Sequence, residues 1–145
     1  MPQKDREVLM GKITKETQLN IIVPNDIGVG ARVFGAIAQS GIYIKAFCAY
    51  GMKKQAHFIL LTDKPTQAVK ALISAGYPVT TDEVLAVQVS DRVGKANELT
   101  EQLSKAGIDI EFCYATGADA GSTEATAIFK TNDNERAMKI LSKLV

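Results

Sequence analysis

The alternation of apolar and polar residues predicts a strand, a helix and a hairpin in the first part of the chain. The run QLNIIV (18–23) is rich in β-branched residues, which is typical of a buried strand. In GARVFGAIAQS (30–40) the apolar residues share one face of a helix, and Gly41 follows where glycine commonly ends a helix. The segments IYIKAFCAY (42–50) and AHFILLT (56–62) then predict a pair of strands joined by a short turn.

A second helix and a short strand follow this hairpin. DKPTQAVKALISAG (63–76) predicts a helix in which Asp63 can cap the first turn and Pro65 suits its start. Gly76 ends this helix, and PVTT (78–81) predicts a short fourth strand.

The second half of the chain repeats this pattern. Glycines and apolar residues coincide at a shift of 66 residues, so that Gly41 falls on Gly107. Further along, QAVKAL (67–72) matches RAMKIL (136–141) at a shift of 69 residues. The additional residues of the second copy fit its hairpin loop, where insertions are tolerated. The chain is therefore a tandem repeat.

The second copy predicts the same elements in the same order, at 84–90, 95–107, 108–116, 123–131 and 132–144. Strand, helix, strand, strand, helix and strand is the order of a ferredoxin-like module. We therefore predict an α+β fold of two ferredoxin-like βαββαβ modules, each with an antiparallel sheet and its helices on one face.

These repeats divide the chain into an N-terminal extension (1–14), a first module (15–81) and a second module (82–145) whose last strand is missing. EVLMGKIT (7–14) has no counterpart in the other copy. We hypothesise that it supplies the missing strand, because an open sheet edge is a liability. A mobile tail or a short leading helix is the alternative.

Composition excludes several classes of protein. With 46% hydrophobic and 23% charged residues, the chain resembles an ordinary soluble globular protein. A net charge of +1 lacks the basic excess of nucleic-acid binders, and no apolar run is long enough to span a membrane. The first residues lack the apolar core of a signal peptide, so we expect a cytoplasmic protein. Cys48 and Cys113 are expected to be small buried apolar residues.

The turn between the first strand and the first helix of each copy is the candidate site. Gly28 and Gly94 allow unusual backbone angles and the close approach of another group. The helix that follows exposes unpaired N–H groups, which can bind a carboxylate or phosphate. Asn25 and Asp91 lie at the rim and could contact an ammonium group. Alternatively, Asn25, Asp26 and Asp91 only cap the two helices.

The order of these motifs resembles that of the ACT domain, a small-molecule-sensing module of amino-acid metabolism. The resemblance covers residues 17–145 as two modules and rests on two matching sets of residues. These are Asn25, Gly28, Gly41, Ile42 and Ile44 in the first copy, and Asp91, Gly94, Gly107, Ile108 and Ile110 in the second.

The resemblance implies that the two modules pair side by side in one continuous sheet and that an amino-acid-like ligand binds at the seam between helices. It further implies a homodimer, a possible partner enzyme, and no catalytic residue, metal or cofactor. The candidate ligand-binding residues are Asn25, Asp26, Ile27, Gly28, Val29, Gly30, Tyr43, Asp91, Arg92, Val93, Gly94 and Asp109.

Two departures from the family pattern affect the expected ligand. Ile27 and Val93 stand where the family usually has proline, and Tyr43 and Asp109 stand where it usually has asparagine. We therefore expect a ligand other than serine, or binding in one copy only. The first copy is the better candidate, because GVGA (28–31) permits the closest approach. In the second copy Lys95 and Asn97 are expected to crowd the helix start.

Other chemistries on this fold fit the sequence less well. His57 is the only histidine, and no Cys-x-x-Cys motif is present, which argues against a metal site. KKQAHFIL (53–60) lacks the paired aromatic residues of an RNA-recognition module. Gly28 and Arg32 could serve an acylphosphatase-like hydrolase, but Glu98 replaces the arginine in the second copy.

The sequence thus favours a non-catalytic regulatory protein that binds an amino acid or a related effector. The alternative is a regulatory subunit of an amino-acid-metabolism enzyme that acts through protein contact with degenerate ligand sites. The acylphosphatase-like hydrolase is the third hypothesis.

Overall fold

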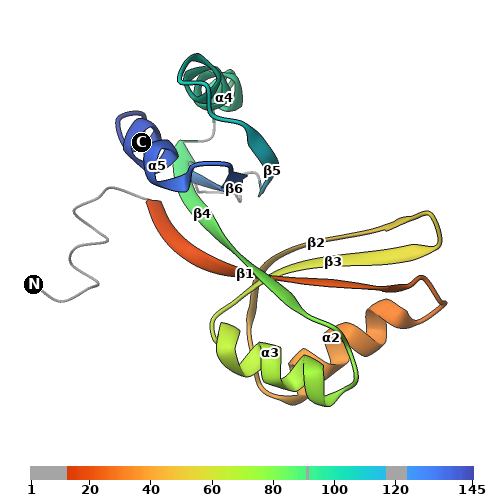
Figure 1. Ribbon diagram of the computed structural model, residues 1–145. Helices are drawn as coiled ribbons and strands as arrows, with labels where there is room; N and C mark the ends of the chain where they lie inside the picture. Colours follow the sequence, from red (N-terminus) through yellow and green to blue (C-terminus); the bar gives the residue numbers. More distant parts are fainter. Residues whose placement is uncertain (1–12, 91, 117–123) are drawn as a thin grey trace, which may run out of the picture. The chain divides into compact units, whose positions relative to one another are not determined.

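The computed structural model describes residues 13–90, 92–116 and 124–145 of the chain. The described strands form a six-stranded sheet in the order β2-β3-β1-β4-β6-β5. By packing, the chain divides into two units, one of residues 17–82 and one of residues 83–145 together with 13–16. Figure 1 shows a pair of helices with the strands of each unit. The predicted α+β fold of two ferredoxin-like modules in a continuous sheet is confirmed.

The unit of residues 17–82 has its helices on one face of the sheet. Strand β1 pairs with β3 and β3 pairs with β2, both antiparallel. Alternate residues of β1 and β3 face helices α2 and α3, and they form an apolar core that includes Leu19, Ile21, Val33 and Leu72, all 0% exposed. The elements are β1 (Ile13–Pro24), α2 (Val29–Gln39), β2 (Ile44–Met52), β3 (Gln55–Thr62) and α3 (Pro65–Ser74).

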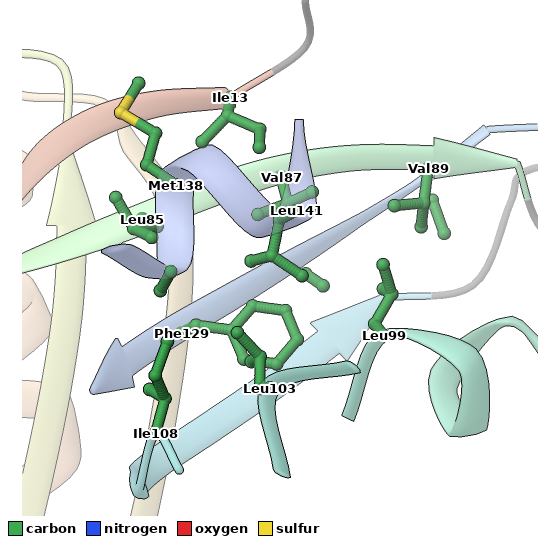
Figure 2. Close-up of a cluster of buried hydrophobic side chains, with 13 residues drawn as sticks. Ile13, Leu85, Val87, Val89, Leu99, Leu103, Ile108, Phe129, Met138 and Leu141 are labelled. Atoms are coloured by element: carbon green, nitrogen blue, oxygen red, sulfur yellow. The ribbon is translucent and has the colours of Figure 1, made fainter. Parts of the chain in front are cut away.

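The unit of residues 83–145 repeats this arrangement. Strand β4 pairs with β6 and β6 pairs with β5, again antiparallel. Its core joins alternate strand residues to the inner faces of two helices (Figure 2). The elements are β4 (Thr80–Ser90), α4 (Lys95–Lys105), β5 (Ile110–Thr116), β6 (Glu124–Thr131) and α5 (Asn134–Leu141).

The repeat predicted from the sequence is present in the backbone. Ile21 pairs with Phe58 in the first copy, and Val87 pairs with Ala127 in the second, at the shifts of 66 and 69 residues. Both copies have an irregularity at the start of the second strand, between Ile44 and Ala46 and at the matching place in β5. The register therefore identifies equivalent positions of the two copies directly.

The hairpin turn and the helix ends follow the sequence prediction. Lys53 and Lys54 have φ values of 51° and 66°, as a two-residue turn between antiparallel strands requires. Gly41 has a φ of 70°, and the N–H of Ile42 donates to the carbonyl of Ile37, which closes the end of α2.

The predicted capping role of Asp63 is wrong. Lys64 is the N-cap residue of α3 and makes no side-chain capping hydrogen bond. The carboxylate of Asp63 instead accepts a hydrogen bond from the N–H of Tyr43 at 3.0 Å, and Asn132 makes the equivalent bond with Asp109. Both side chains therefore hold the start of a neighbouring strand.

The predicted fourth strand of the first copy does not end before the second copy begins. It forms the start of β4, which continues without a break through the first strand of the second copy. One long strand is favoured here because the polar segment TTDE (80–83) contains no glycine or proline that would interrupt it.

The beginning of β1 packs with the second copy. Residues 7–12 of the hypothesised extra strand lie outside the described residues, whereas Ile13 and Thr14 begin β1. Ile13 is 0% exposed and lies in the core of the second unit, near Leu85 and Met138 (Figure 2). The ammonium group of Lys15 donates to the carboxylate of Glu135 on α5, and this hydrogen bond raises the pKa of Lys15. In the strand order, β1 is the neighbour of β4.

Replacing Ile13 by alanine should therefore lower the free energy of unfolding by about 2–5 kcal/mol, because it leaves a cavity in a closed core. Chemical denaturation measures this loss. Ile73→Ala is the control, since Ile73 is 57% exposed and its removal should change stability by no more than about 0.5 kcal/mol. Equal effects of the two substitutions would show that Ile13 does not belong to the core.

Candidate functional site

Each candidate turn is built on a glycine with a left-handed backbone. Gly28 and Gly94 have φ values of 87° and 86° and are the N-cap residues of α2 and α4. Side chains other than glycine are strained in this conformation. The chain thus turns directly from the strand into the helix at the same angle in both copies.

Neither N-cap glycine has a side chain that could accept a hydrogen bond from the first turn of its helix. Helix α5 shows the contrast, because there the Asp133 carboxylate accepts from the N–H of Arg136 at 3.1 Å. A helix start without such a cap keeps N–H groups that can bind an anion. The turns therefore retain the property for which the sequence singled them out.

Asn25 does not cap α2, which was one alternative. A Cβ placed on Gly51 would lie 2.7 Å from the side-chain nitrogen of Asn25, so the amide lies against the β2–β3 hairpin. The backbone N–H of Asn25 donates to the carbonyl of Lys54. Among the described residues, Asp26 contributes its backbone carbonyl to the turn, which accepts from the N–H of Val29. Asp91 lies outside the described residues.

The turn tips are fully open to solvent. Ile27 is 104% exposed and Val93 is 100% exposed, at equivalent positions of the two turns. Val29 and Gly30 belong to the first turn of α2, where Val29 is buried beneath the helix. The apolar side chains that replace the family's proline therefore make no contribution to either core.

Tyr43 and Asp109 lie at the opposite end of their sheets from the glycine turns. Tyr43 precedes Ile44, which pairs with the last residue of β3, whereas Pro24, just before the turn, pairs with the first residue of β3. The second copy has the same arrangement. Within one unit, the structure therefore does not bring Tyr43 or Asp109 together with the other candidate residues.

A cavity of about 270 Å³ lies between α4 and the sheet of the second unit. Its helix side consists of Lys95, Ala96, Leu99 and Thr100. Its sheet side includes Val89, Cys113, Ala115, Ala125, Ala127 and Phe129. Val89 on β4 and Leu99 on α4 lie at the same end of the core cluster (Figure 2). The cavity thus lies beneath the helix start that Gly94 produces.

Two positively charged side chains line the cavity, and no acidic residue is among the described residues that do. Lys95 is only 8% exposed, and its ammonium group donates to the carbonyl of Leu144 at 2.6 Å. The carboxylate of Glu98 lies 3.6 Å from Lys95 and also pairs with Arg92. The positive end of the α4 dipole adds to these charges.

In the first unit the equivalent space contains three aromatic rings. Phe34, Phe47 and Phe58 form a cluster in which the ring of Phe34 lies 5.0 Å from that of Phe47 and 5.8 Å from that of Phe58. The ring of Phe58 also approaches the first turn of α2, at 3.9 Å from a Cβ placed on Gly30.

The second copy has small residues at all three positions. According to the shared register, Phe34, Phe47 and Phe58 correspond to Thr100, Cys113 and Ala127, each of which lines the cavity. Three missing rings beneath the same backbone account for the cavity. The sequence interpretation overlooked this signal, which a comparison of aligned positions in the two copies would have found.

Two sequence expectations about the second copy need correction. Lys95 does not close off the helix start, because its side chain lines the cavity instead. Cys113 is exposed and not buried, whereas Cys48 is partly buried. The reason is that Cys113 lies on β5 at the end of the strand order and faces small neighbours.

The remaining candidates have structural environments. The His57 ring stacks on Tyr50 with centroids 4.7 Å apart. Arg32 lies over Gly28 and donates to the carbonyl of Ile27 at 3.5 Å. The described residues contain no group of three or more metal-ligating side chains close enough to hold an ion. None of the helices in the described ranges has both the length and the apolar character that a membrane crossing requires.

A family model described as an ACT domain pair matches residues 14–144, nearly the whole chain. The chain belongs to the ACT domain pair family. The resemblance inferred from the glycine turns is therefore correct, and both modules are ACT modules. A search of curated proteins finds no significant match.

Solved structures share the ACT-pair fold at low sequence identity. Protein BT0572 from Bacteroides thetaiotaomicron is 20% identical with a TM-score of 0.82, over 92% of this chain and 90% of that chain. The regulatory subunit of aspartate kinase from Thermus thermophilus is 15% identical with a TM-score of 0.65, over 91% and 95%. A structure of aspartokinase alpha and beta subunits is 21% identical with a TM-score of 0.63, again over 91% and 95%.

The aromatic cluster of the first ACT module can be tested by truncation. Phe58→Ala should lower the free energy of unfolding by about 3–5 kcal/mol, because the ring is 4% exposed and packs beneath α2. Phe47→Ala should cost less than half as much, since that ring is already 56% exposed. Denaturant titration of both variants measures the difference. A loss below about 1 kcal/mol for Phe58→Ala would contradict its role in filling the module.

Proposed function

We propose that this protein is a non-catalytic regulatory protein of the cytoplasm that binds an amino acid or a related small effector. The observation that carries the proposal is the uncapped helix start at Gly94, which lies directly over the cavity of the second module. A helix start supplies N–H groups for a carboxylate, and the cavity supplies room for the remainder of a small molecule.

A regulatory protein must transmit binding to something else. Several of the similar structures are named as regulatory subunits or as parts of aspartate kinases, which makes a partner enzyme of amino-acid metabolism a reasonable proposal for this chain. A homodimer is the second proposed assembly. Effector binding changes the activity of a partner only if the effector has different affinities for two arrangements.

The alternative is a subunit that acts through protein contact with degenerate ligand sites. The rings of Phe34, Phe47 and Phe58 favour it for the first module, because they take up space beneath the helix start. The hydrolase hypothesis has less support. The guanidinium group of Arg32 lies 3.3 Å from a Cβ placed on Gly28, where an acylphosphatase-like site would need room for phosphate.

Thermal-shift measurements with each of the twenty amino acids test the proposal. The effector should stabilise the protein by about 2.7 kcal/mol at one hundred times its dissociation constant. Gly94→Val should abolish the response if the second turn is the site, because Gly94 has a φ of 86° and a side chain there disturbs the helix start. Gly28→Val tests the first turn in the same way.

Gly35→Val is the matched control. Gly35 lies within α2, and a Cβ placed there has no neighbour within 4 Å, so the variant should keep the full response. If no amino acid stabilises the unmodified protein, the effector proposal fails and the protein-contact alternative gains support.

A further inference from the structure

We infer that the cavity of the second ACT module is a site for a short branched aliphatic carboxylate, and that the first module has no equivalent site. The inference rests on the proposed function and adds to it the class of ligand and the place where the ligand binds. It differs from a seam between modules, because every residue that lines the cavity belongs to the unit of residues 83–145.

The size of the cavity limits the ligand. An apolar cavity of about 150 Å³ admits a benzene ring, whereas pockets for drug-sized ligands begin near 300 Å³. The volume of about 270 Å³ lies between these values. A branched chain of a few carbon atoms fits this space, and a large aromatic or two-ring molecule does not.

The chemistry of the walls determines the body of the ligand. Val89, Leu99 and Phe129 are at most 6% exposed, and Ala125 and Ala127 form the floor between them. Aliphatic groups gain free energy when they move from water into such surroundings, in proportion to the apolar area that is buried. The walls thus favour branched aliphatic groups over polar side chains.

The charges determine the head group. Lys95 and Arg92 line the cavity, and the positive end of α4 begins at the same place. Glu98, the acidic partner of both cations, is not among the lining residues. A carboxylate is attracted by this arrangement, whereas an aliphatic amine is repelled. Thr100 can donate or accept a hydrogen bond from the next turn of the helix.

Cys113 provides a direct readout, because its thiol lines the cavity and is exposed. The probe is 4-methylpentanoate, and the measurement is the rate at which iodoacetamide alkylates Cys113, followed by peptide mass spectrometry. At ten times the dissociation constant the probe should slow this rate roughly tenfold. Cys48 lies in the other module, and its alkylation rate is the internal control and should not change.

Variants at the cavity locate the binding. Ala127→Phe copies Phe58 of the first module, so its ring should fill the cavity and remove the protection of Cys113. A melting temperature at or above that of the unmodified protein would show that the variant is folded. If Ala127→Phe does not fold, Thr100→Phe serves the same purpose, since Thr100 lies on the partly exposed helix side and corresponds to Phe34.

The head group is tested with an uncharged analogue. 4-Methylpentanamide has the same body without the charge, and it should bind about tenfold or more weakly than 4-methylpentanoate. Lys95→Met keeps most of the aliphatic side chain and removes the ammonium group, so it should abolish this preference. Leucine and 4-methyl-2-oxopentanoate then establish whether an amino acid or a 2-oxo acid of the same shape binds better.

Three results would overturn the inference. These are no protection of Cys113 by 4-methylpentanoate, equal protection in a folded Ala127→Phe variant, and equal binding of acid and amide. The proposed function fails separately. An amino-acid response that persists in Ala127→Phe supports an effector site elsewhere and rejects only the cavity. Protection by 4-methylpentanoate without any amino-acid response supports the cavity and rejects the amino-acid effector.

Discussion

The architecture of both candidate sites depends on a glycine that adopts a left-handed backbone between a strand and a helix. At Gly28 and Gly94 the chain turns within a few residues, so that the first helical turn lies over the end of the strand that precedes it. A side chain at either position would strain this turn. The turn has two consequences, since it leaves N–H groups without a capping side chain and it requires something to occupy the space beneath the first turn of the helix.

The two copies meet the second requirement differently. In the first, Phe58 extends from β3 under α2 and contacts Phe34, so packing fills the space with rings. In the second, Ala127 and Thr100 leave it open. An unfilled apolar cavity lowers stability in proportion to its volume, and a protein keeps such a cavity at a cost. Duplication allows one copy to retain dense packing while the other keeps space for a ligand.

The sequence was sufficient to predict the elements and the repeat, because apolar period and glycine position are local signals. Gly41, Gly76 and Gly107 all have positive φ values at the ends of helices, as their positions indicated. Asp63 was misjudged because a carboxylate next to a helix start can bind either that helix or a neighbouring strand. The N–H of Tyr43, distant in sequence, determines which. The same limit applies to β1, where Ile13 packs against residues from the other half of the chain.

The candidate site was only partly predictable for a related reason. Glycines identify where a ligand can approach, but the room for it depends on side chains from three different elements. Phe34, Phe47 and Phe58 are far apart in the sequence, and each alone has the character of an ordinary core residue. Only the register of the strands shows that all three face the same space. Exposed small residues on a helix give no such indication.

Lys95 connects the cavity of the second module with the end of the chain. Its buried ammonium group binds the carbonyl of Leu144, beyond α5, while its side chain lines the cavity. A buried cation requires hydrogen-bond partners, and removing one of them is unfavourable unless another replaces it. A carboxylate in the cavity would compete with Leu144 and Glu98 for this group. Occupancy of the cavity would then alter how firmly the segment after α5 is held, which is a differential interaction of the kind that a regulatory ligand requires.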